Sequence, residues 1–201
     1  MGQANRRRQE AEMQQQGRLP PGQIFTSKFP VFTCEPVTPT FDPQTWDFRV
    51  FGEIERPQVW TWDEFLKLPT VTITTDIHCV TRWSKFDTTW EGVPFKHLAE
   101  LVGIRDTTRH IIAHCQGGYT TNVPVEDMLR ENVLLAYKYN GDWLEPDHGA
   151  PLRTLIPHLY LWKSAKFLRA LEFSPVDKPG FWETRGYHNH GDPLKEERYG
   201  R

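Results

Sequence analysis

Short apolar runs separated by turn residues constrain the fold of this chain more than any other feature. In residues 45–54, "TWDFRVFGEI", the side chains of Trp46, Phe48 and Val50 alternate with others, which is the period of a half-buried strand. Residues 70–77, "TVTITTDI", read as a second strand that leads directly to Cys79. Further strands are predicted at 110–115, 133–144, 151–157 and 166–173, with a hairpin turn at "NG" in the second of these.

Short helices are predicted between these strands. Residues 61–69 begin with a possible capping box of Thr61 and Glu64, and residues 93–103 place apolar residues on one face before Gly103. A third short helix is predicted at 125–131. Strands with short helices between them, several joined by hairpin-like turns, predict an α+β fold: a mixed, mostly β single domain.

The length and composition predict one ordered domain after a polar tail. A chain of 201 residues with 38% hydrophobic residues can bury one ordinary core. Residues 1–24 are rich in Gln and Arg, so we expect a disordered or loosely attached tail, followed by one domain over 25–201. The repeated prolines of residues 28–44 predict an extended segment laid over that domain.

The charge and the cysteines predict location and partners. A formal net charge of -2 gives no reason to expect nucleic acid, and no window is apolar enough for membrane insertion. The three cysteines, at 34, 79 and 115, cannot all pair, which favours a reducing compartment. The arginine run at 6–8 is not followed by the apolar segment of an export signal. We therefore expect a cytoplasmic monomer.

Cys79 lies at a predicted strand end among polar residues, and its sequence context leaves several interpretations open. The thiol can be a buried, inert side chain. It can bind zinc together with His78, His114 and Cys115, in a structural or interaction module, although neighbours on a strand point to opposite faces. It can also be a nucleophile with His78 or His114 as the base.

Four short motifs favour a further interpretation. "CVTRWS" at 79–84, "WEGVP" at 90–94, "GAPLR" at 149–153 and "WKSAK" at 162–166 occur in that order. The chain over about 28–190 resembles the molybdopterin-binding domain of the sulfite oxidase family, especially its small bacterial members, related to the methionine-sulfoxide reductase catalytic subunit. The resemblance implies a molybdenum-molybdopterin cofactor whose metal is held by one protein thiolate, and Cys79 matches that ligand.

The stretch from 148 to 166 carries donors that suit the phosphate of a pterin cofactor. It contains His148, Arg153, Lys163, Ser164 and Lys166, and an arginine can grip phosphate with two parallel hydrogen bonds. The resemblance implies cofactor contacts for four of these, Lys163 excepted. It also matches Cys115 to a pterin-contacting threonine of the reductase relatives.

The catalytic candidates lie next to the metal ligand. With Cys79 they are His78, Arg82 and Trp83; the resemblance matches Trp83 to an aromatic near the metal, and the other two could supply positive charge. Family members that oxidise sulfite tend to have an arginine where this chain has Ser84. Further candidate substrate contacts follow in the C-terminal tail: Arg185, Tyr187 and His188.

The resemblance implies an oxidoreductase that transfers an oxygen atom to or from a small S-oxide, N-oxide or sulfite-like substrate. The chain has no haem attachment motif. We therefore expect a small-molecule substrate and an external electron donor or acceptor protein.

Overall fold

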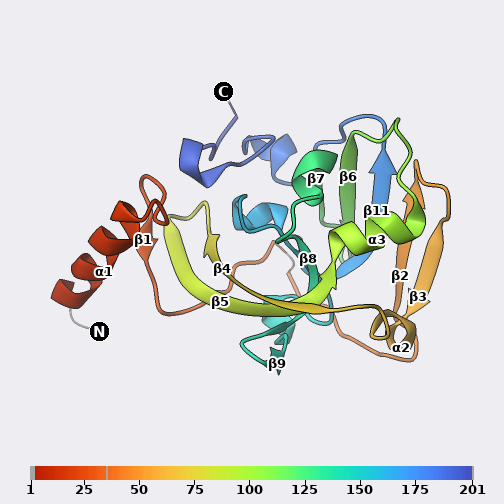
Figure 1. The fold of residues 1–201 in the computed structure, drawn as a ribbon, viewed down its shortest axis with the longest axis horizontal. Helices are drawn as coiled ribbons and strands as arrows, with labels where there is room; N and C mark the ends of the chain where they lie inside the picture. The colour runs from red at the N-terminus through yellow and green to blue at the C-terminus, as the bar shows by residue number, and fades with distance from the viewer. Residues whose placement is uncertain (1–2, 35, 201) are drawn as a thin grey trace.

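The computed structural model describes residues 3–34 and 36–200. In these residues two sheets and several short helices form a mostly β domain, which confirms the predicted α+β class (Figure 1). No helix in this part of the chain has both the length and the apolar character that a bilayer crossing needs.

The first sheet is built around one long strand, β5 (Trp83–Pro94), which Figure 1 shows as a curved arrow along the lower side of the molecule. The strand order is β1-β5-β8-β10, with β4 also paired to β5 and β9 to β8. The partners are β1 (Ile24–Phe25), β4 (Val71–His78), β8 (Leu134–Tyr139), β9 (Asp142–Trp143) and β10 (Arg153–Leu155). As predicted, β8 turns back into β9 at Asn140 and Gly141, both with positive φ.

The second sheet has the order β3-β2-β11-β6-β7. Its strands are β2 (Asp47–Gly52), β3 (Gln58–Thr61), β6 (His110–Cys115), β7 (Thr120–Pro124) and β11 (Leu168–Ser174). The central strand β11 pairs parallel with β2 and antiparallel with β6. Strand β11 follows closely after the site-bearing residues 148–166 and returns the chain to the core.

The helices and turns cover the sheets. The α-helices are α1 (Gln3–Gln15), α2 (Trp62–Phe65), α3 (Phe95–Val102) and α4 (Val125–Met128). The 3-10 helices are η1 (Pro146–His148), η2 (Leu161–Lys163), η3 (Glu183–Arg185) and η4 (Pro193–Lys195). The predicted capping box of Thr61 and Glu64 is present at the start of α2.

The main core lies between the second sheet, α3 and strands β5 and β8. Helix α3 buries Phe95, Leu98 and Val102 completely and ends at Gly103, whose φ of 69° is the conformation that favours glycine. Each such apolar side chain contributes roughly 1.5–3 kcal/mol when fully buried. Because this core includes residues of both sheets, they form one folded unit.

The first 24 residues differ from the disordered or loosely attached tail that their composition predicts. Residues 3–15 form α1, and Met13 packs against Phe25 and Phe86. Arg18 then pairs with Asp76 at 2.7 Å. These contacts with the body hold the polar segment, which composition alone cannot indicate; residues 1 and 2 lie outside the described part.

Candidate active site

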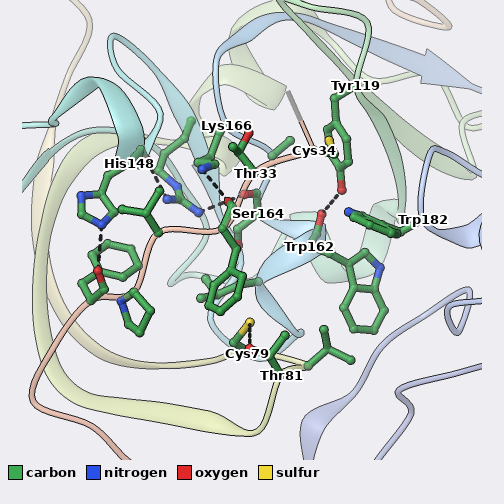
Figure 2. A pocket seen from close by; sticks show the side chains of 18 of the residues that line it. Thr33, Cys34, Cys79, Thr81, Tyr119, His148, Trp162, Ser164, Lys166 and Trp182 are labelled. Atoms are coloured by element: carbon green, nitrogen blue, oxygen red, sulfur yellow. Dashed lines mark hydrogen bonds between the residues drawn. The ribbon is translucent and has the colours of Figure 1, made fainter. Parts of the chain in front are cut away.

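A pocket of about 290 Å³ brings together residues from distant parts of the chain (Figure 2). Six predicted site residues line it: Cys79, Trp83, His148, Arg153, Ser164 and Lys166. The extended segment before β2 forms one wall with Phe29, Pro30, Val31, Phe32, Thr33 and Cys34. The C-terminal tail adds Trp182 and Tyr187.

Cys79 follows directly after β4, on a tight loop that we call the ligand loop, residues 79–83. The Cys79 N–H donates to Trp83 O at 2.9 Å, and the Arg82 N–H donates to Cys79 O at 3.0 Å. The φ of 73° at Arg82 lies in the left-handed region, which is uncommon outside glycine. Thr81 Oγ1 donates to Cys79 Sγ at 3.1 Å, and burial raises the pKa of this thiol. Thr81 was not among the sequence-based candidates.

Opposite Cys79 in Figure 2, one end of the pocket gathers cationic and polar donors. His148 Nε2 donates to Phe29 O at 3.1 Å, and Lys166 Nζ donates to Phe32 O at 2.7 Å. Gly149, with a φ of 108°, passes so close to Lys166 that a Cβ would lie 3.0 Å from its side chain. The "HGAP" glycine therefore lets His148 and Lys166 share this end.

Arg153 lies behind these donors and is 3% exposed. Its guanidinium donates to His148 O at 2.8 Å, Ser164 O at 3.0 Å and Thr154 O at 3.3 Å. Among the described residues it forms no ion pair with a carboxylate. Burial lowers the pKa of Arg153 to about 10, and burial together with the charge of Arg153 lowers the pKa of Lys166 to about 8. Among the described residues, Arg153 and Lys166 thus bring positive charge to this end of the pocket without a carboxylate ion pair of their own, whereas His148 lies 3.3 Å from Glu145.

The other end of the pocket is aromatic. Trp162 and Tyr187 meet edge to face with ring centroids 5.1 Å apart, and Tyr187 stacks on Trp182 at 4.8 Å. Tyr119 Oη donates to Trp162 O at 2.5 Å. Of these residues the sequence indicated only Tyr187 as a contact, although Trp162 is the first residue of the "WKSAK" motif. We call Trp162, Trp182 and Tyr187 the aromatic wall.

Four of the predicted cofactor-binding and catalytic residues do not line this pocket. His78 points to the other side of β4, because neighbouring residues on a strand alternate; its Nδ1 lies 2.8 Å from Ser84 Oγ, and burial lowers the pKa of His78 to about 4. Ser84 is therefore also directed away from the pocket. The Arg82 side chain lies near Gly22 outside the pocket, and Cys115 is buried in the main core.

Lys163 is the fourth. It is fully buried and pairs with Glu183 at 2.6 Å, while it donates to Asn122 O at 2.7 Å. Trp162 Nε1 donates to the same Glu183 oxygen at 2.9 Å. Lys163 therefore supports the aromatic wall from behind, and the cofactor contact predicted for it is not part of the observed pocket.

The zinc interpretation requires His78, Cys79, His114 and Cys115 to converge, and they do not. His114 lies 3.1 Å from Glu172 on the second sheet, whereas Cys79 lies in the pocket. In residues 3–34 and 36–200, no group of three or more His, Cys, Asp or Glu side chains is arranged to hold a metal ion. Of the C-terminal candidates, Arg185 stacks over Phe181 and His188 lies beside Glu197, both outside the pocket lining.

Comparison with known protein families assigns the chain to one of them. Residues 35–182 match the model of the oxidoreductase molybdopterin-binding domain, which covers most of the chain. This chain belongs to that family. It is an oxidoreductase domain of the sulfite oxidase type, with the molybdenum-molybdopterin cofactor that defines the family.

Several relatives support this assignment. The chain is 43% identical over 185 residues to the uncharacterized oxidoreductase YuiH of Bacillus subtilis (strain 168), covering 92% of this chain and 93% of YuiH. It is 23% identical to the protein-methionine-sulfoxide reductase catalytic subunit MsrP of Campylobacter jejuni, covering 75% of this chain and 56% of that one. With sulfite oxidase of Arabidopsis thaliana the identity is 25%, over 72% of this chain and 46% of the other. The chain thus spans about half the length of the last two.

A solved structure shows the same fold. The sulfane dehydrogenase SoxCD of Paracoccus pantotrophus superposes with a TM-score of 0.64 and 20% sequence identity, over 74% of this chain and 42% of that one. The predicted fold type is therefore confirmed.

The pocket residues fit the family's cofactor on their own chemistry. A thiolate is a soft ligand that suits a sulfur-ligated metal, and Cys79 Sγ faces the pocket. The buried Arg153 charge, balanced only by carbonyl oxygens among the described residues, suits an anionic phosphate.

Proposed function

We propose that this pocket holds the molybdenum cofactor through Cys79 at one side and the cationic end at the other, and catalyses oxygen-atom transfer on a small S-oxide, N-oxide or sulfite-like substrate. The observation that carries the proposal is that Cys79 and Arg153, which are far apart in the sequence, line one pocket. Family membership supports the oxidoreductase chemistry.

Each part of the pocket has a role in this proposal. Cys79 is the protein ligand of the metal, and Thr81 holds its sulfur in place through a hydrogen bond. Arg153, Ser164, Lys166 and His148 bind the phosphate and fix the cofactor's orientation. When bound, the cofactor supplies the two-electron chemistry of oxygen-atom transfer.

The aromatic wall binds the substrate and excludes water. In Figure 2 the apolar faces of Trp162 and Trp182 lie on the side of the pocket away from His148 and Lys166. Tyr187 lines the same pocket and packs against both rings. An anion that enters an aromatic environment loses hydration that only fixed positive donors replace. The two arginines that could have supplied such donors, Arg82 and Arg185, lie outside the pocket lining. We therefore propose a neutral S-oxide or N-oxide in preference to sulfite.

An external protein donates or accepts the electrons. One relative is named a putative protein-methionine-sulfoxide reductase subunit, and MsrP is named a catalytic subunit, which supports a partner for this chain as well. The cytoplasmic location indicated by the cysteine usage stays a prediction, and fractionation of cells that express the native gene tests it.

Steady-state kinetics test the proposed substrate class. Cofactor-loaded protein is assayed with an artificial electron carrier for sulfite oxidation and for reduction of dimethyl sulfoxide, trimethylamine N-oxide and methionine sulfoxide. We expect a higher kcat/KM for one of the three oxides than for sulfite. A far higher kcat/KM for sulfite would refute the proposed preference for a neutral oxide. It would require a positively charged hydrogen-bond donor to sulfite outside the observed pocket lining.

A further inference from the structure

The ligand loop is held from behind by side chains that come from both terminal regions. Gln23 Nε2 donates to Cys79 O at 2.9 Å, and Arg198 donates from one terminal nitrogen to Val80 O at 2.7 Å. These donors lie 56 and 118 positions from their acceptors. Two successive carbonyl groups of the ligand loop are thus fixed by remote side chains.

Arg198 is an unusual residue for this place because it is a buried cation with weak partners. It is 5% exposed, its second terminal nitrogen donates to Pro21 O at 3.2 Å, and its guanidinium lies 5.0 Å from the Tyr160 ring centroid. Its carboxylate neighbour among the described residues is Glu196, at 3.7 Å and itself 46% exposed on its side chain. A buried charge is costly unless it is well paired.

The position of Arg198 suggests what balances this charge. The guanidinium contacts the residue directly after Cys79 but does not itself line the pocket. A metal-bound thiolate carries negative charge, and opposite charges attract more strongly in a buried, low-dielectric region than in water.

We propose that Arg198 is a positioning residue for the metal ligand: it fixes the Val80 peptide and places a permanent positive charge behind Cys79, which raises the reduction potential of the bound metal. The physical reason is that each electron added to the metal makes the centre more negative, and a nearby fixed cation favours the more negative state. The proposal rests on the proposed function in one respect, namely that Cys79 is the ligand.

Two substitutions separate the charge from the hydrogen bond. Arg198→Gln keeps a donor for Val80 O and removes the charge, whereas Arg198→Lys keeps the charge on a shorter donor. The matched control is Arg185→Met, in the same C-terminal tail, because Arg185 is an exposed arginine that stacks on Phe181 and does not touch the ligand loop. For each variant, molybdenum per chain is measured by elemental analysis and the midpoint potential of the bound metal by EPR-monitored redox titration.

We expect a downward shift of the midpoint potential in Arg198→Gln, a potential near the wild-type value in Arg198→Lys, and no change in Arg185→Met. A merely structural arginine would alter stability and metal content in the first two variants without separating their potentials. Equal potentials for the Gln and Lys variants, or loss of metal from the Lys variant with its charge intact, overturn the proposal.

Cys79→Ser keeps the two hypotheses apart. Full molybdenum content in that variant would refute Cys79 as the ligand, and hence the proposed function of the pocket. If the midpoint potential does not shift in Arg198→Gln while metal binding still depends on Cys79, only the role of Arg198 is refuted.

Discussion

Replacement of Arg153 by methionine separates the binding of the cofactor phosphate from the stability of the fold. The side chain is almost fully buried, and its described hydrogen-bond acceptors are three carbonyl oxygens. Methionine has a comparable length and no charge. The substitution therefore removes a positively charged donor that has no carboxylate partner among the described residues.

The magnitudes differ between the cofactor-free and the cofactor-bound protein. Burial lowers the pKa of Arg153 to about 10, which corresponds to about 3 kcal/mol of cost for keeping the charge inside. Three hydrogen bonds from a charged donor contribute roughly 1.5–3 kcal/mol each, and their loss leaves three carbonyl oxygens without this donor, so the cofactor-free protein should also lose stability. A charge-assisted pair to phosphate contributes about 1.5–3 kcal/mol, so cofactor affinity should fall about 10- to 150-fold.

Elemental analysis and thermal melts measure both quantities. Protein produced in molybdenum-depleted and molybdenum-replete cells is compared for wild type, Arg153→Met and Arg153→Lys. We expect a lower Tm for the cofactor-free Met variant than for wild type, a larger difference in Tm between the cofactor-bound forms, and a large loss of molybdenum in the Met variant. The Lys variant should lie between the two, because lysine keeps the charge and loses the planar fork that matches phosphate.

Two results would contradict this reasoning. Full molybdenum loading of Arg153→Met would remove the guanidinium from the cofactor site. An equal loss of Tm in the cofactor-free and cofactor-bound forms would make Arg153 a residue of the fold alone.

Two other substitutions give clear expectations. Cys79→Ser should leave a folded chain, seen by circular dichroism, that has lost molybdenum and oxidoreductase turnover, whereas Cys34→Ser should keep both; equal losses in the two variants would count against Cys79 as the ligand. His190→Gln should lower Tm at acid pH, by about 2–4 °C for a charged hydrogen bond contributing about 1 kcal/mol, and the deficit should shrink as pH rises. Hydrogen bonds to Asp127 and Glu197 raise the pKa of His190 above its ordinary value of about 6.5, so its stabilisation is complete below that pH and is lost as pH rises through the folded-state value. A deficit independent of pH from 5.5 to 9 would refute this assignment.

Local signals in the sequence predict much of the fold. The capping box of Thr61 and Glu64, the stop at Gly103 and the turn at Asn140 depend on neighbours within a few residues, and all are present in the structure. Strand β5 was not predicted, because its sequence "WSKFDTTWEGVP" mixes charged and apolar residues without a clean period. It is a strand because β1, β4 and β8 all pair with it. Helix α1 was not predicted for the same kind of reason, since its contacts are with the distant body.

For the site residues, too, the sequence predicts position along the chain but not the direction in which each side chain points. Motif spacing placed Arg153 and Lys166 in the pocket, but it could not tell that Lys163, three residues before Lys166, points to Glu183 instead. Strand alternation separates Cys79 from His78, and this difference can be predicted from the sequence wherever the strand itself is predicted. The contact of Arg198 with the ligand loop joins residues 118 positions apart, and no local pattern in the sequence announces it.

The two ends of the pocket become available at different stages of synthesis. The cationic end comes from residues 148–166, so it can form as soon as that stretch and the strands around it have been made. The aromatic wall needs Trp182 and Tyr187, and the Arg198 contact needs a still later residue. A nascent chain that stops short of these residues offers a phosphate cradle that is open to solvent on one side. The enclosed pocket therefore requires the C-terminal tail as well as residues 148–166.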